Sequence, residues 1–157
     1  MNKKELLDHI DKEAIVTAIE RAEKLCSGEI RVHIEPGLHK REIWDVAKKT
    51  FERMGMTRTA QRNGVLLFIA SKEQQFVILG DREIDERVEP GFWDHLASDL
   101  AEHFRRGEFT EGIVQMIEES GARLQQYFPF QRGDLNELPN QVSIGDAPDE
   151  NADDRER

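Results

Sequence analysis

The stretch Gly64-Val-Leu-Leu-Phe-Ile-Ala70 decides the fold, because it carries no polar side chain at any of its positions. A strand with apolar side chains in both alternating directions is buried on both faces of a sheet. The earlier stretch Glu29–Glu35 alternates instead, with Ile30, Val32 and Ile34 on one side and polar residues on the other. This alternation predicts a strand that is half buried.

Helical patterns surround these two strands. Apolar residues recur at helical spacing from Asp11, a suitable N-cap, to Gly28, which we expect to end the helix. The other predicted elements are a helix over residues 41–54 stopped by Gly55, a hairpin strand over 75–80, an acidic loop over 81–89, a helix from Pro90 to Gly107, and a helix capped by Thr110. The predicted order is therefore α-β-α-β-β-α-α, an α/β protein.

The charge is distributed unevenly along the 157 residues. The chain has 32 acids and 22 bases, a net charge of -10 that argues against binding to nucleic acid. Residues 133–157 hold eight acids and two bases, and their apolar pattern fades. We expect one domain over residues 1–132, followed by an acidic, disordered tail over residues 133–157.

Several classes of site lack a sequence signature. Cys26 is the only cysteine, so the chain has neither an internal disulfide nor a cysteine-based zinc site. The chain starts on charged helical sequence, and its longest apolar run is too short for a membrane span. We therefore expect a soluble, cytoplasmic protein with no membrane span. The nucleophile-elbow, P-loop, dinucleotide-binding and zinc-protease motifs are absent from the sequence.

Four segments, in chain order, resemble the TPM domain. They are residues 27–34 (SGEIRVHI), 62–70 (RNGVLLFIA), 76–81 with 84–85 (FVILGD and ID), and 104–109 (FRRGEF). The resemblance covers roughly residues 10–130 and implies a three-layer α/β/α sandwich with a small mixed sheet. Plant thylakoid members of this family are described as acid phosphatases in photosystem II repair, and some bacterial members bind calcium.

The predicted topology gathers acids at one edge of the sheet. A right-handed β-α-β unit followed by a hairpin places the first two strand starts beside the end of the third strand. The acids in these segments are Glu29, Asp81, Glu83, Asp85 and Glu86. Their oxygens are the ligands that calcium or magnesium requires, and we expect Asp81 and Asp85, with Glu29 and Glu86, to hold the ion. Gly80 and Asp85 also match the family pattern.

Other interpretations of these residues remain open. The acids could form a solvated loop paired with Arg82 and Arg87. A phosphatase could hold phosphate on Arg62 and Arg82, with the metal on Asp81 or Asp85, although no catalytic residue is identified. His95 and His103 lie eight positions apart on one predicted helix, too far to chelate one ion together.

Three functions are therefore expected from the sequence. The first is a TPM-domain module that binds a divalent cation, calcium or magnesium, or that binds another protein. The second is a metal-dependent hydrolase that resembles acid phosphatases. The third is an adaptor whose acidic tail recruits a basic partner protein.

Overall fold

The computed structural model describes residues 6, 8–130 and 142–145. In chain order, the elements are α2 (Lys12–Glu23), β1 (Glu29–Glu35), α3 (Ile43–Arg53), the 3-10 helix η1 (Met56–Arg58), β2 (Gly64–Ala70), β3 (Gln75–Gly80), α4 (Arg82–Arg87), α5 (Phe92–Arg105), α6 (Phe109–Tyr127) and β4 (Ser143–Ile144). The α/β class is confirmed, with β4 as an additional strand.

The strands form a mixed sheet in the order β3-β2-β1-β4. β1 and β2 are parallel, and Glu29 lies opposite Gly64 at the start of both strands. β2 and β3 form the predicted antiparallel hairpin, in which Val65 lies opposite Gly80. The helix α3 makes the crossover between the two parallel strands, as such connections require.

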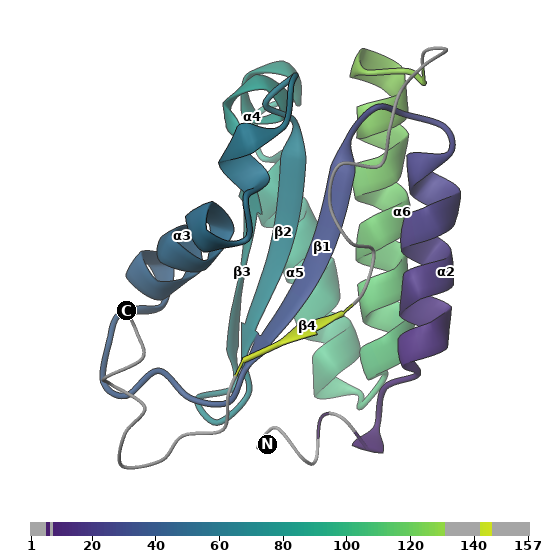
Figure 1. Ribbon diagram of the computed structural model, residues 1–157. Coiled ribbons are helices and arrows are strands. Elements are labelled where there is room, and N and C mark those ends of the chain that lie inside the picture. Colours follow the sequence, from purple (N-terminus) through teal and green to yellow (C-terminus); the bar gives the residue numbers. More distant parts are fainter. Residues whose placement is uncertain (1–5, 7, 131–141, 146–157) are drawn as a thin grey trace.

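Helices cover both faces of the sheet, as Figure 1 shows. Val65, Leu67 and Ile69 of β2 belong to the core that packs against α2, α5 and α6. The alternate side chains, Leu66, Phe68 and Ala70, belong to a second core beneath α3. Because β2 is buried on both faces, the protein is the expected three-layer α/β/α sandwich.

The prediction of a half-exposed β1 is wrong. Glu29, Arg31 and His33 are only 2%, 1% and 4% exposed. Their side chains lie on the face that also carries Leu66 and Phe68, and the His33 ring stacks on Phe68 with 5.5 Å between centroids. Buried polar groups are tolerated where they are hydrogen-bonded or paired. Both conditions hold in this strand.

Of the three boundaries predicted for the first two helices, the structure confirms two and contradicts the third. Asp11 is the N-cap of α2, and its Oδ1 accepts a hydrogen bond from Ala14 N at 3.1 Å. Gly55, with φ of 79°, follows α3. Gly28 does not end α2, which stops at Glu23. A Cβ on Gly28 would lie 2.7 Å from Leu124 Cδ2, so this glycine permits close packing against α6.

Three predicted boundaries in the second half are also corrected. The segment 81–89 contains the short helix α4 and is not simply a loop. α5 begins at Phe92, after Gly91 in the left-handed region, and not at Pro90. Thr110 lies inside α6, and its Oγ1 accepts a hydrogen bond from Asp11 N at 3.0 Å. The Thr110 hydroxyl therefore ties the two helices together.

The predicted tail falls mainly outside the described residues. Residues 142–145 are the described part of the segment 133–157, and they contain β4. The predicted disorder of the other tail residues therefore stays a prediction. In the part of the chain that the structure describes, no helix has both the length and the apolar character to cross a membrane.

The Gly28 contact generates a prediction about stability. We expect Gly28→Ala to lower the free energy of unfolding by about 1 to 3 kcal/mol, because the added methyl group overpacks the buried Leu124. Urea-induced unfolding measures this effect. In a Leu124→Ala background the same substitution should cost much less, and an equal cost in both backgrounds would contradict the assigned contact.

Candidate functional site

The predicted edge of the sheet is formed as expected. The starts of β1 and β2 and the end of β3 lie side by side, and Asp81 N donates to Gly64 O at 2.8 Å. The acids at this edge nevertheless have other partners. Asp81 accepts two hydrogen bonds from Arg62, at 2.6 Å from Nε and 2.9 Å from Nη2. The Asp81 hydrogen bond raises the pKa of Arg62.

Asp81 has a second structural role at this edge. Its Oδ1 accepts a hydrogen bond from Arg82 N at 2.8 Å, and Asp81 is the N-cap of α4. The carboxylate is also buried, being 7% exposed. Charge pairing with Arg62 and capping of α4 together explain why an acid is placed at the end of β3.

The remaining proposed ligands do not converge on one point. Glu29 Oε1 pairs with Arg31 Nη2 at 2.7 Å. Asp85 Oδ1 accepts a hydrogen bond from Trp93 Nε1 at 2.9 Å, while Glu86 is exposed. In the described segments, no three of the acids Glu29, Asp81, Asp85 and Glu86 bring ligand atoms within 4.8 Å of one another. The proposed phosphate anchors are also separate, since Arg62 is bound by Asp81 and Arg82 is 65% exposed.

A buried charge network fastens α2 to β1. Glu23 Oε2 accepts hydrogen bonds from Arg31 Nη1 at 2.6 Å and from Ile30 N at 2.8 Å. Burial raises the pKa of Glu23 to about 7, although the positive charge of Arg31 and the Ile30 N–H act in the opposite direction. The nearby carboxylate of Glu29 also raises this pKa. We interpret the network as structural, because it joins a helix end to the start of a buried strand.

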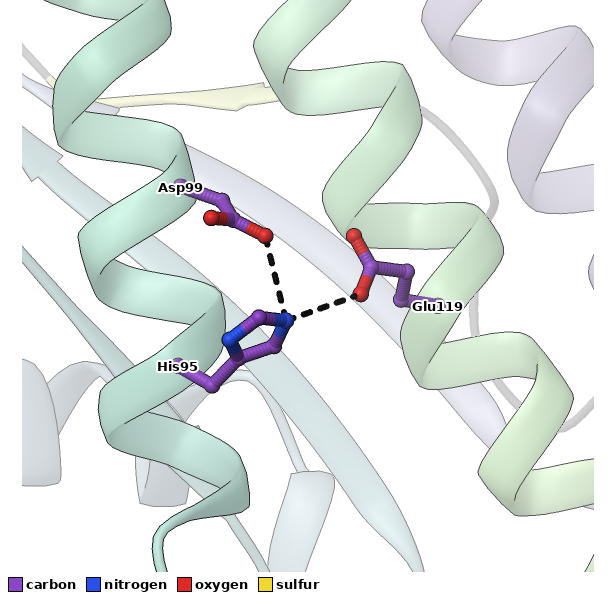
Figure 2. A group of neighbouring side chains, drawn as sticks. All are labelled: His95, Asp99 and Glu119. Carbon is purple, nitrogen blue, oxygen red and sulfur yellow. Dashed lines mark ion pairs between the residues drawn. The ribbon is translucent and has the colours of Figure 1, made fainter.

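A different group of side chains converges on one point at the surface between α5 and α6 (Figure 2). His95 and Asp99 lie one turn apart on α5, and Glu119 lies on α6. His95 Nε2 is 3.2 Å from Asp99 Oδ2 and 3.8 Å from Glu119 Oε1. One ligand atom of each residue lies within 4.8 Å of the other two. Among the described residues, this is the one such group of three or more histidine, cysteine or acidic side chains.

The spacing of this group suits a small metal ion. Tetrahedral ligands at zinc-like bond lengths are separated by about 3.3 to 3.6 Å from one another. The two His95 distances, 3.2 and 3.8 Å, lie close to that interval. In the absence of an ion, a protonated His95 would form ion pairs with both carboxylates, so the same geometry also serves as a surface salt bridge.

A line of hydrogen bonds behind the group orients Glu119. Gln115 Nε2 donates to Glu119 Oε2 at 2.9 Å, which leaves Oε1 facing His95. Gln115 Oε1 in turn lies 2.7 Å from His103 Nε2, and His103 Nδ1 lies 2.8 Å from Glu108 Oε1. Hydrogen bonds to Gln115 and Glu108 raise the pKa of His103, because both ring nitrogens donate in the charged form.

The sequence contained one signal for this group that was missed. His95 and Asp99 are four positions apart, which places them on the same face of a helix. The prediction from the sequence compares His95 only with His103, and the structure places these two residues in separate contacts. Glu119 could not be found in this way, because its position depends on how α5 packs against α6.

Comparisons with known proteins agree with the fold described above. A family model for the TPM domain matches residues 1–123, most of the chain. The chain belongs to the TPM domain family. The resemblance noted in the sequence is thereby confirmed, and the matched span lies within the predicted domain of residues 1–132.

A solved structure supports the same TPM fold. The NMR structure of BA42 protein from the psychrophilic bacteria Bizionia argentinensis sp. nov. is 41% identical to this chain, with a TM-score of 0.78. The similarity covers 85% of this chain and 92% of that chain. No curated protein matches the chain.

The raised pKa of Glu23 predicts a pH dependence of stability for this TPM domain. The folded state binds the proton more tightly than the unfolded chain, so stability should fall as the pH rises from about 4.5 to about 7. The substitution Glu23→Gln keeps an acceptor oxygen for Arg31 and Ile30 but has no proton to release. We therefore expect the free energy of unfolding of this variant to fall less steeply with pH than that of the wild type, by up to about 1.4 kcal/mol per pH unit.

Urea unfolding of both proteins between about pH 4.5 and about pH 7.5 measures this difference. Glu20→Gln is the matched control, because Glu20 is exposed on the same helix. Parallel pH profiles for the wild type and Glu23→Gln would show that Glu23 titrates alike in the folded and unfolded states.

Proposed function

We propose that this TPM domain binds a divalent metal ion between α5 and α6, with His95, Asp99 and Glu119 as its ligands. The observation that carries the proposal is the convergence of these three side chains on one point (Figure 2). Three protein ligands leave further coordination positions for water or for a donor group of a partner. The proposal thus keeps a divalent cation as part of the function and moves it away from the acids of the sheet edge.

The donor set favours a first-row transition metal of the zinc type over calcium or magnesium. An imidazole nitrogen with two carboxylates suits Zn²⁺, Mn²⁺ or Fe²⁺, whereas calcium and magnesium prefer oxygen ligands throughout. The second carboxylate oxygen of Glu119 is held by Gln115, as is common for metal-binding carboxylates. The ion pairs of Asp81 with Arg62 and of Glu29 with Arg31 weigh against calcium at the sheet edge.

The described contacts give less support to the other two functions. A phosphatase would need free positive charge near a metal or a nucleophile, but Arg62 is paired with Asp81. The adaptor proposal depends on the acids of the tail, and none of these acids lies in its described part, residues 142–145. A partner protein remains compatible with the metal proposal, because its own side chain could complete the coordination of the ion.

Titration with Zn²⁺ tests the proposal. We expect the wild-type chain to bind a single ion by calorimetry, with amide shifts centred on residues 95–99 and 115–119. His95→Ala and Asp99→Asn should each weaken binding by at least ~10-fold, because each removes a ligand. Asp94→Asn is the matched control, since Asp94 is an exposed acid next to His95.

Equal affinity of the wild type and His95→Ala for Zn²⁺ would overturn this assignment. A parallel titration with Ca²⁺ tests the acids of the sheet edge. Shifts confined to residues 80–86 on adding Ca²⁺, together with no effect of Zn²⁺ on α5, would place the cation at Asp81 and Asp85 instead.

The hydrogen bond from Gln115 generates a separate prediction. Gln115→Ala should lower the affinity for Zn²⁺ by about 10-fold without removing a ligand, because Glu119 loses the contact that orients its carboxylate. Gln126→Ala, an exposed position on the same helix, should leave the affinity unchanged. The same calorimetric titration measures both variants, and a wild-type affinity in Gln115→Ala would contradict the orienting role.

A further inference from the structure

The outer edge of β1, defined as the side that faces away from β2, is covered in an unusual way. β2 pairs with β1 along its whole length, from Glu29 to Glu35. On the other side, β4 pairs with β1 only at His33 and Ile34, in the parallel direction. Most of this edge therefore has no partner strand within the described residues, although open edges readily accept further strands.

Two kinds of hydrogen-bonding partner satisfy backbone groups that face this edge. Side chains cover the first part, where Ile30 N donates to Glu23 Oε2 at 2.8 Å and Ile30 O accepts from Arg31 Nη1 at 2.5 Å. Because backbone direction alternates along a strand, the groups of Ile34 face the same way as those of Ile30. At that end, Ile34 O accepts a hydrogen bond from Gly145 N at 2.8 Å. A buried ion pair closes one half of the edge, and a piece of the tail closes the other half.

The tail piece fits the edge through identifiable contacts. Ser143 Oγ lies 2.9 Å from His33 Nδ1, so the hydroxyl group is bonded to a buried ring. Val142 packs against the larger core, and Ile144 is half buried. A Cβ on Gly145 would lie 2.5 Å from Glu35 Oε1, which favours glycine at this position. The fitting pattern is an apolar residue, a hydroxyl residue, an apolar residue and glycine.

The tail piece, residues 142–145, is held by fewer backbone hydrogen bonds than a strand of ordinary length. β4 contains two residues, whereas five or six are typical of strands, so few ladder hydrogen bonds secure it. Residues 131–141 separate it from Phe130, the last described residue before the gap. Short segments with few buried contacts open at a small cost in free energy. We therefore expect the release of this occupant from the edge to cost little free energy.

We propose that the outer edge of β1 at His33 and Ile34 is a strand-addition site for an extended segment of a partner protein. Residues 142–145 occupy this site in the free chain and are displaced when the partner binds. The partner segment runs parallel to β1 and carries the same apolar, hydroxyl, apolar, glycine pattern. Backbone hydrogen bonds supply the affinity of such complexes, while the alternating side chains supply the specificity.

A labelled synthetic peptide with the sequence of residues 140–147 (NQVSIGDA) tests the proposal on the full-length chain. Gly145→Pro removes the N–H that bonds Ile34 O, and the proline ring would meet Glu35. We expect this variant to bind the peptide roughly tenfold more tightly than the wild type, because its own tail no longer competes. Amide shifts should centre on residues 32–35.

Two peptide controls separate strand addition from unspecific binding. A peptide with proline in place of its glycine should not bind, and a peptide with alanine in place of its serine should bind more weakly because it loses the His33 contact. Ser143→Ala in the full-length chain weakens the attachment of the tail less severely, because it removes only the hydroxyl that contacts His33 and keeps every backbone donor. We expect this variant to bind the peptide more tightly than the wild type.

Two results would overturn the proposal. The first is that Gly145→Pro and Ser143→Ala bind the peptide with the same affinity as the wild type. Failure of the peptide to bind a variant that circular dichroism shows to be folded would count in the same way. The second is a concentration-dependent dimer of the wild type that the peptide dissociates. That dimer would assign the edge to the tail of a second copy. Neither result depends on metal binding, since the site between α5 and α6 uses different residues.

Discussion

The strand β2 is enclosed on both faces, and each of its side chains lies in one of two cores. A fully buried large apolar side chain contributes about 1.5 to 3 kcal/mol, so exposing either face of this strand would cost much of the stability of a domain of this size. One face must therefore be covered by α3 and the other by α2, α5 and α6. The packing of α5 beside α6, which the surface group of His95 requires, follows from this double burial.

The sequence predicts elements that depend on local patterns. The apolar run of β2, the hairpin to β3 and the cap at Asp11 all follow from neighbouring residues, and the structure confirms them. Alternation gives a wrong prediction at β1, because an arginine that is buried and paired with Glu23 and Glu29 has the same spacing as one exposed to solvent. Gly28 was misinterpreted for a related reason, since its role depends on Leu124, far away in the chain.

The functional residues show the same division between local and distant information. Topology correctly brought acidic segments to one edge of the sheet, but it did not reveal that Arg62 reaches Asp81 there. Opposite charges placed close together neutralise one another, so a concentration of acids in the sequence is a weak guide to a cation site. His95 and Asp99 share a helix face that the sequence contains, whereas Glu119 and Gln115 come from another helix whose register is set by core packing.

The contact between Trp93 and Asp85 has a consequence for how this molecule can be observed. The indole of Trp93 packs over Gly80, where the absence of a Cβ makes room for it, and its Nε1 donates to the carboxylate of Asp85. The chain has one other tryptophan, Trp44, which is 44% exposed on α3. The two indoles thus belong to different helices, α3 and α5, which cover opposite faces of the sheet. The fluorescence of Trp93 is an intrinsic optical signal for the junction of β3, α4 and α5.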